Sequence, residues 1–305
     1  MKDLIILGNG MAGMTAALYA KRANLDFKIV GRDEFDFGQI GNAILVENFP
    51  CVASQSGMDL AMSLHDQLID NDIQIEEHEV TKITQTIINN SGLIFLINYA
   101  DGTNETCKAV IYALGASHRK LNCEIEEGIP IHYCALCDGP LYKDKNVAII
   151  GGGDVAFTQA EYLSKICNRV TIVMCDENVT AADATFKRVK NINNIYIIQN
   201  YPVNKIEKNQ DKIGKISLLC AARPDDSINV DGIFVAIGMI PNLEPIKFLP
   251  IKSISMGIVA TENGETELEG FFVAGDVRMK NVRQGLTAAA DGANAVNSVI
   301  NYLKK

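Results

Sequence analysis

The chain has 305 residues, 48% hydrophobic and 21% charged, which is typical of a globular protein with room for two domains. Its 28 Lys and Arg face 37 Asp and Glu, and the net charge of −9 disfavours binding to nucleic acid. No leader pattern and no run of roughly 18 apolar residues is found, so we expect a cytoplasmic protein without a membrane span.

The N-terminal segment predicts a dinucleotide-binding turn. An apolar strand at residues 4–7 runs into Gly8, Gly10 and Gly13, then into a helix and a second strand that ends near Val30. In such a turn the first glycine permits the bend and the second lets the backbone approach a pyrophosphate. The third lets helix and strand pack closely, and the helix N-terminus attracts the phosphates.

The same pattern occurs again in the middle of the chain. A strand at residues 147–150 leads into Gly151, Gly153 and Ala156, and the next strand covers residues 170–173. The sequence therefore predicts a second dinucleotide-type fold.

The segments between these turns set the domain organisation. Residues 80–107 alternate as in a β meander, and two apolar strands end at Gly115 and Gly238, where the chain is expected to cross between domains. The predicted fold class is α/β, with two Rossmann-like, doubly wound, three-layer domains, the second inserted into the first. Residues 1–115 and 242–305 form the first predicted domain, and residues 116–241 form the second.

The eight cysteines do not form a secreted disulfide framework, because their spacing is irregular. Only Cys134 and Cys137, in "HYCALCDG", have the spacing of a redox or metal pair. Zinc would need two further ligands; His132 supplies one candidate, and no second CxxC or HxxxH occurs, so we predict no metal site. The other six cysteines are expected to be ordinary thiols.

Over its whole length the chain resembles the low-molecular-weight thioredoxin reductases. The matching segments are "GNGMAG", "FGQI", "ENFP", "YALGASHRKL", "CALCDG", "GGGDVA", "FVAIGMIPN", "AGDV" and "RQGLTAAADGANA". The resemblance implies an FAD domain interrupted by a smaller domain that carries a redox-active disulfide, usually in a homodimer. It also implies thioredoxin as the partner that is reduced.

The resemblance assigns roles to individual residues. Cys134 would attack the disulfide of thioredoxin, Cys137 would contact the flavin, and Asp138 would relay a proton, since a thiol must lose its proton to attack. Asp276 would hold the sugar and ribityl hydroxyls of FAD. The full set of residues expected around FAD is Gly8, Gly10, Gly13, Gly38, Gln39, Asn48, Gly115, Gly275, Asp276, Arg283, Gln284 and Ala288.

The second fold departs from the family where NADPH would bind. Met174 stands at the usual histidine, and Cys175, Asp176 and Thr180 stand at three usual arginines. Because each charge-assisted hydrogen bond contributes about 1.5–3 kcal/mol, these replacements disfavour NADPH. Asp176 lies where an acid can accept from the ribose 2′-hydroxyl of NAD, so NADH remains an alternative cofactor.

The altered nucleotide site is similar to that of the ferredoxin-dependent flavin thioredoxin reductases, which lack the NADPH motif. Thr158 and Gln159 also replace two usual glutamates. The preferred electron donor is therefore reduced ferredoxin. The basic segment that holds Arg278, Lys280 and Arg283 is one candidate docking patch for it. The other interpretation of this segment is a solvated loop with one flavin contact.

Three alternative functions of the chain remain, and so does an alternative role for Cys51. The chain could be an NADH-dependent thioredoxin reductase, a flavin-bound sensor or binding protein, or a dithiol oxidase. Cys51, where the family usually has glycine, could be a third redox thiol, although a small residue tolerated in a loop is the simpler interpretation.

Overall fold

The computed structural model describes the chain except residues 44–45, 47, 89–91, 210–215, 221–222 and 305. The chain forms two compact units, one of Met1–Ser117 with Met239–Lys305 and one of His118–Gly238. The chain crosses between them twice, so the second unit is inserted into the first. The predicted α/β fold class with two Rossmann-like halves is confirmed.

The first unit is built on a seven-stranded sheet in the order β3-β2-β1-β6-β5-β4, with β20 paired to β6. Its strands are β1 (Lys2–Leu7), β2 (Phe27–Gly31), β3 (Ile75–Glu77), β4 (Val80–Ile88), β5 (Gly92–Tyr99), β6 (Asn104–Tyr112) and β20 (Phe271–Val273). β1 is parallel to β2 and β6, whereas β4, β5 and β6 form an antiparallel meander. Residues 89–91 of the predicted meander lie outside the described residues.

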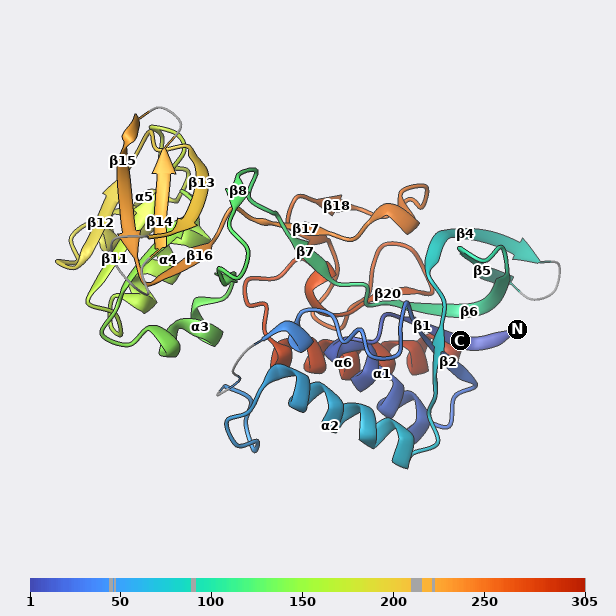
Figure 1. The fold of residues 1–305 in the computed structure, drawn as a ribbon. Coiled ribbons are helices and arrows are strands. Elements are labelled where there is room, and N and C mark those ends of the chain that lie inside the picture. The colour runs from blue at the N-terminus through green and yellow to red at the C-terminus, as the bar shows by residue number, and fades with distance from the viewer. Residues whose placement is uncertain (44–45, 47, 89–91, 210–215, 221–222, 305) are drawn as a thin grey trace. The chain divides into compact units, whose positions relative to one another are not determined.

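Three helices cover one face of this sheet, and α1 and α6 lie side by side (Figure 1). They are α1 (Met11–Arg22), α2 (Gly57–Asp70) and α6 (Gly285–Leu303). Close packing of α1 on α6 depends on small residues, because a Cβ on Gly292 would lie 2.2 Å from the carbonyl oxygen of Ala12. The contact places the N-terminal halves of both helices together.

Short elements complete the first unit. They are η1 (Ile40–Asn42), η3 (Glu244–Ile246), η4 (Gly275–Val277), and the hairpin strands β18 (Ser253–Ile254) and β19 (Gly257–Ile258). Strand β17 (Met239–Pro241) pairs with β7 (Ala116–His118), whose last residue already belongs to the second unit. Among the described residues, no helix combines the length and apolarity needed to cross a bilayer.

The second unit has a five-stranded parallel sheet in the order β12-β11-β10-β16-β9 and a four-stranded sheet in the order β15-β14-β13-β8. The first contains β9 (Ile131–His132), β10 (Asn146–Ile150), β11 (Arg169–Val173), β12 (Ile195–Ile198) and β16 (Gly232–Val235). The second contains β8 (Glu124–Ile125), β13 (Val203–Lys208), β14 (Ile216–Cys220) and β15 (Arg223–Val230). Its helices are α3 (Ala135–Asp138), η2 (Gly139–Tyr142), α4 (Asp154–Leu163) and α5 (Asp183–Val189).

The parallel sheet is buried on both faces, which explains why β10 is a continuous apolar run. Val147 and Ile149 pack into the core under the helices, and Ala148 and Ile150 pack into the core shared with the four-stranded sheet. The glycine turn and α4 therefore follow directly from the end of a fully buried strand.

Candidate active site

The turn after β1 has the form of a phosphate-binding loop. A Cβ on Gly8, where φ is +107°, would lie 2.5 Å from the carbonyl oxygen of Ala113, and a Cβ on Gly13 would lie 1.7 Å from that of Gly8. Gly10 is the N-cap of α1, and no described side chain caps this helix. The first N–H groups of α1 can therefore bind an anion.

Asp276 lies near the start of α1, because a Cβ on the neighbouring Gly275 would be 3.0 Å from the Cβ of Ala12. Its Oδ1 is buried and has no hydrogen-bond partner among the described residues, with Lys280 Nζ 3.5 Å away. Burial raises the pKa of Asp276, and the positive charges of Lys280 and Arg283 oppose this rise. A buried carboxylate oxygen beside a phosphate loop suits the hydroxyl groups of a dinucleotide.

Residues distant in sequence meet near the start of α6. Asn48 Nδ2 donates to Gln284 Oε1 at 3.1 Å, and Gln284 is the N-cap of α6 in a capping box with Thr287. Gln39 Nε2 donates to the carbonyl oxygen of Ala116 at 3.1 Å. The structure thus joins Asn48 with Gln284, two of the residues expected beside FAD.

The remaining residues expected beside FAD also belong to the first unit. No described atom lies within 4 Å of the Cβ position of Gly38 or Gly115, so both backbones border open space. The Nε of Arg283 is buried without a hydrogen-bond partner among the described residues. The Cβ of Ala288 lies 3.9 Å from the Cβ position of Gly275.

The turn after β10 repeats the geometry of the first turn. A Cβ on Gly151 would lie 2.4 Å from the carbonyl oxygen of Ala236, as Gly8 faces Ala113 in the first unit. Gly153 is the N-cap of α4, and the Cβ of Ala156 is 3.3 Å from the Cβ position of Gly151. A dinucleotide-type turn is therefore present in each unit.

The edge where a 2′-phosphate would lie has no cation at the three altered positions. The Cys175 thiol donates to Asp176 Oδ2 at 3.1 Å, and this bond raises the pKa of Cys175. Thr180 Oγ1 donates to the carbonyl oxygen of Gly152 at 3.1 Å, while Met174 is buried, with its Cε 2.9 Å from the Cβ position of Gly152. The site presents a carboxylate, which repels phosphate and accepts from hydroxyl groups.

Cys134 and Cys137 form a disulfide, with a Cα–Cα distance of 5.3 Å. Cys134 is the N-cap of α3, and its Sγ accepts from the backbone N–H of Cys137 at 3.2 Å. Both cysteines are half-buried, and Leu136 between them is exposed. A disulfide at this spacing can open and close by thiol–disulfide exchange.

A buried histidine contacts the carboxylate that follows this disulfide. His132 Nδ1 lies 3.0 Å from Asp138 Oδ2, and His132 Nε2 lies 2.7 Å from the hydroxyl oxygen of Tyr142. The sequence suggested His132 only as a zinc ligand. The available signal was a histidine and a tyrosine on either side of "CALCD", and it does not reveal that His132 contacts Asp138 or that Tyr142 contacts His132.

Gln159 also has a role that the sequence did not predict. Its Nε2 donates to the carbonyl oxygen of Tyr133 at 3.1 Å, so α4 supports the residue before Cys134. Thr158, by contrast, is exposed. One of the two altered positions of the nucleotide helix is therefore a support for the redox turn.

Two cations of the basic segment after β20, Arg278 and Lys280, contact a buried carboxylate and do not form the candidate docking patch. Arg278 makes a bidentate contact with Asp291, with Nε–Oδ2 and Nη2–Oδ1 distances of 3.2 and 2.7 Å. Lys280 Nζ donates to Asp291 Oδ2 at 3.0 Å, and its side chain is only 7% exposed. These two cations neutralise a buried carboxylate, which leaves them unsuited to docking.

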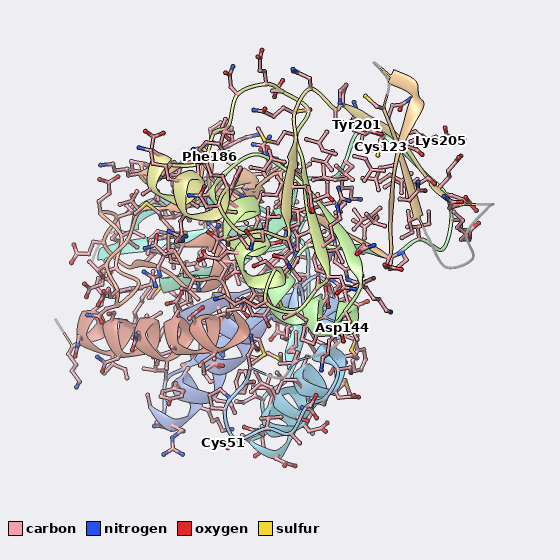
Figure 2. All side chains as sticks on the ribbon, turned by 90° about the vertical axis from the view of Figure 1, so that its left-hand side faces the viewer. Cys51, Cys123, Asp144, Phe186, Tyr201 and Lys205 are labelled. Atoms are coloured by element: carbon pink, nitrogen blue, oxygen red, sulfur yellow. A yellow bond between two sulfur atoms is a disulfide. The ribbon has the colours of Figure 1, made fainter. Side chains whose placement is uncertain are left out.

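The six cysteines outside the disulfide are free thiols. Figure 2 labels Cys51 and Cys123; Cys51 is exposed and has a φ of +67°. Cys107 is buried, and burial raises its pKa to about 12, so it is an unreactive core residue.

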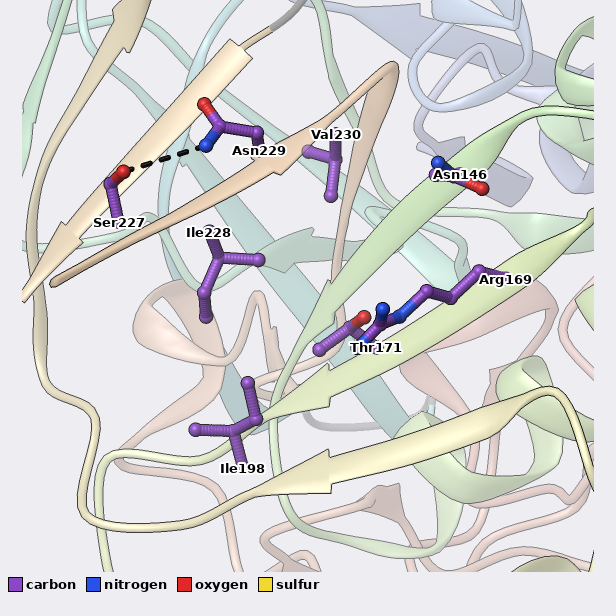
Figure 3. Close-up of a pocket in the computed structure, with 8 residues that line it drawn as sticks. All are labelled: Asn146, Arg169, Thr171, Ile198, Ser227, Ile228, Asn229 and Val230. Atoms are coloured by element: carbon purple, nitrogen blue, oxygen red, sulfur yellow. Dashed lines mark hydrogen bonds between the residues drawn. The ribbon is translucent and has the colours of Figure 1, made fainter.

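A separate pocket of about 280 Å³ lies in the second unit, between the parallel sheet and β15 (Figure 3). Its lining residues are Asn146, Arg169, Thr171, Ile198, Ser227, Ile228, Asn229 and Val230. Asn146 and Arg169 are the first residues of β10 and β11, whereas ligands of parallel sheets bind at the carboxyl ends of the strands. The pocket contains no residue of the redox turn.

Comparisons with known proteins agree with this geometry. The profile of the pyridine nucleotide-disulphide oxidoreductase family matches residues 2–292. The thioredoxin reductase of Bacillus subtilis is 32% identical over 99% of this chain and 95% of its own, and that of Mycoplasma genitalium is 34% identical over 97% and 94%. The crystal structure of thioredoxin reductase from Streptococcus pyogenes superposes with a TM-score of 0.86 at 32% identity, covering 100% of this chain and 98% of the other. The chain therefore belongs to the pyridine nucleotide-disulphide oxidoreductase family and, within it, to the low-molecular-weight thioredoxin reductases.

Proposed function

We propose that the chain is a flavin-dependent disulfide reductase that reduces thioredoxin through Cys134 and Cys137. The observation that carries this proposal is the disulfide itself, at the start of α3 and directly before a buried carboxylate. Membership of the thioredoxin reductase family supports thioredoxin as the partner. A cytoplasmic homodimer is the assembly proposed with it.

FAD is the cofactor that fits the first unit. The glycine turn would hold its pyrophosphate, Asp276 its hydroxyl groups, and Asn48 and Gln284 would lie beside the ring. When bound, FAD supplies electrons in pairs to a disulfide. The orphaned Oδ1 of Asp276 is the structural feature that favours this fit.

The cysteines and Asp138 then share the exchange with thioredoxin. Cys134 loses its proton and attacks the partner's disulfide, after which Cys137 attacks Cys134 and closes the internal disulfide again. Asp138 directly follows Cys137 and is buried, so it is the group proposed to hold the transferred proton.

The proposed electron donor is reduced ferredoxin rather than NADPH. The support is the absence of arginine at Cys175, Asp176 and Thr180, where a 2′-phosphate would otherwise be bound. Because Arg278 and Lys280 are engaged with Asp291, a ferredoxin surface would have to use other residues. NADH is the second candidate, favoured by the exposed carboxylate of Asp176 after β11.

An anaerobic experiment tests both the reaction and the donor. The purified flavoprotein is mixed with NADPH, NADH or reduced ferredoxin, and the flavin absorbance is followed before and after oxidised thioredoxin is added. Bleaching by ferredoxin alone, reversed by thioredoxin, is the expected result. Rapid bleaching by NADH would instead assign the donor site to Asp176, and a bleached flavin that thioredoxin does not reoxidise would refute the proposed reaction.

A further inference from the structure

His132 is buried beside the redox turn with both ring nitrogens in contact with polar groups. The ring is 3% exposed, and its Nδ1 and Nε2 contact Asp138 Oδ2 and the Tyr142 hydroxyl at 3.0 and 2.7 Å. Because a carboxylate can only accept, Nδ1 carries the proton toward Asp138. The ring therefore bridges a phenol and the carboxylate next to Cys137.

Packing fixes the orientation of this ring. Phe234 lies against His132 with ring centroids 5.2 Å apart, and Tyr142 meets it edge to face at 5.2 Å. Tyr142 in turn occupies the space over Gly232, where a Cβ would lie 2.1 Å from the phenol ring. The alignment of His132 with Asp138 is thus set by two aromatic rings, Phe234 and Tyr142, rather than by solvent.

Of the polar groups next to the His132 ring, Tyr142 keeps its proton, and the Asp138 carboxylate is the group that can accept another. Burial raises the pKa of Tyr142, and the charges of Asp138 and Asp231 raise it further, so the phenol stays protonated at neutral pH. The Nζ of Lys145 lies 5.7 Å from the centroid of the Tyr142 ring, so this cation contacts the neighbour of His132. The Oδ1 of Asp138 is buried without a hydrogen-bond partner among the described residues, so it can take up a proton.

We propose that His132 is a positioning residue for proton transfer, which holds Asp138 through Oδ2 and shares the proton that Asp138 exchanges with the redox cysteines. This inference rests on the proposed disulfide exchange. An imidazole suits the role because its charge ordinarily changes near neutral pH, and its contact with Asp138 lets the pair hold the proton as carboxylate and imidazolium.

Each of the two thiol attacks in the exchange releases one proton. The Cys134 proton passes to the Asp138–His132 pair as Cys134 sulfur bonds to one sulfur of the partner, and the departing partner thiolate takes that proton. Cys137 then gives up its proton as its sulfur bonds to Cys134, which breaks the mixed disulfide, and the second partner thiolate takes this proton through the same pair. Two protons and two electrons thus leave the two cysteines for the partner.

The test measures how fast iodoacetamide alkylates Cys134 in the intact flavoprotein, reduced with dithiothreitol and desalted without oxygen, from pH 5 to pH 9. We expect a wild-type profile with two ionisations, one from the thiol and one from the Asp138–His132 pair. His132→Gln keeps an amide donor but cannot titrate, so its profile should show a single ionisation. A His132→Gln profile with the same two ionisations as wild type would overturn the proposal.

Matched variants separate this role from simple packing. His78→Gln removes another histidine–aspartate contact, Nδ1 to Asp101 Oδ2 at 3.1 Å, and should leave both ionisations unchanged. Tyr142→Phe keeps the Asp138–His132 pair and should keep two ionisations. Should His132→Gln fold poorly, His132→Asn is the second variant without an imidazole, and a profile with the same two ionisations as wild type would equally overturn the proposal.

Turnover with thioredoxin distinguishes the two proposals. His132→Gln should slow oxidation of the reduced cysteines by oxidised thioredoxin about tenfold at pH 7, the effect of one charge-assisted hydrogen bond. If the wild-type protein reduces no thioredoxin, the proposed function fails, whereas the alkylation profile still decides whether His132 titrates with Asp138. If thioredoxin is reduced equally fast by both proteins, only the role of His132 fails.

Discussion

Gln159 Nε2 donates a hydrogen bond of 3.1 Å to the carbonyl oxygen of Tyr133, the residue before the redox cysteine Cys134. The contact links helix α4, which follows the second glycine turn, to the segment that carries the disulfide. Its Oε1 is buried without a hydrogen-bond partner among the described residues, so the amide is held by its nitrogen alone. An amide at this position therefore supports the redox turn.

Substitution of Gln159 by glutamate should destabilise the protein. The carboxylate has no hydrogen to donate, and its charge would face the Tyr133 carbonyl oxygen, so we expect a loss of about 1–3 kcal/mol in the free energy of unfolding. Thr158→Glu introduces the same charge on an exposed neighbour and should change stability by less than about 0.5 kcal/mol. Urea unfolding of both variants gives the comparison, and equal losses would show that charge rather than the hydrogen bond matters.

The glycine turns could be predicted from the sequence because their requirements are local. Gly8 and Gly13 are constrained by atoms of the same strand–turn–helix unit and of the adjacent strand, so spacing alone reveals them. The Cys134–Cys137 pair is equally local, since only two residues lie between the two cysteines. The insertion of the second domain was predicted from the two apolar strands that end at Gly115 and Gly238, where the chain was expected to cross between domains.

The contacts around these features could not be predicted, because they depend on which way side chains turn in the folded unit. Arg278 and Lys280 looked like surface cations, yet both bind Asp291 from the next helix. His132 was weighed only as a metal ligand, and its partner Tyr142 lies ten residues later, beyond the redox pair. No periodicity in the sequence indicates such a tertiary polar network.

Replacement of Cys134 by serine should abolish reduction of thioredoxin while leaving the flavin bound. A hydroxyl cannot form the mixed disulfide, so turnover should fall at least about a hundredfold. Cys123→Ser, at a half-buried free thiol of the same unit, is the matched control and should keep its activity. Thioredoxin-dependent reoxidation of the reduced flavin is the measurement, and substantial activity in Cys134→Ser would exclude the proposed exchange.

Asp176 should control the reactivity of Cys175. Its carboxylate accepts from the thiol, which raises the pKa of Cys175, so Asp176→Ala should lower that pKa and increase the thiolate fraction near pH 8. Iodoacetamide labelling of Cys175, followed by mass spectrometry, should therefore become faster in the variant. Labelling of the exposed Cys51 serves as the internal control, and an unchanged Cys175 rate would contradict the contact.

Gly232 should tolerate no side chain, because a Cβ there would lie 2.1 Å from the ring of Tyr142. We expect Gly232→Ala to displace this ring from His132 and to cost about 1–3 kcal/mol in the free energy of unfolding. Gly41→Ala is the control, since its nearest neighbour would be the Cβ of Phe37 at an ordinary 3.5 Å. Chemical unfolding measures both effects, and a neutral Gly232→Ala would mean that Tyr142 has space to move.

When no flavin is bound, the ionised carboxylate of Asp276 should lower the free energy of unfolding at neutral pH. Burial raises its folded-state pKa above the usual 3.8, so the stability from its protonated form is fully present below pH 3.8 and is lost as the pH rises through the raised value. Asp276→Asn cannot ionise, and the flavin-free variant should unfold at a higher temperature than wild type at pH 7. Each kcal/mol corresponds to about 2–4 °C for a domain of this size.

The dependence on pH separates this effect from a general change in packing. The advantage of Asp276→Asn should shrink as the pH is lowered toward 3.8, where the wild-type carboxyl also becomes neutral. Asp291→Asn provides the opposite case, because it removes the partner of buried Arg278 and Lys280 and should destabilise the protein by several kcal/mol. If Asp276→Asn raised the unfolding temperature equally at every pH, the ionised carboxylate of wild-type Asp276 would carry no cost in stability. Lys280 would then already neutralise that carboxylate.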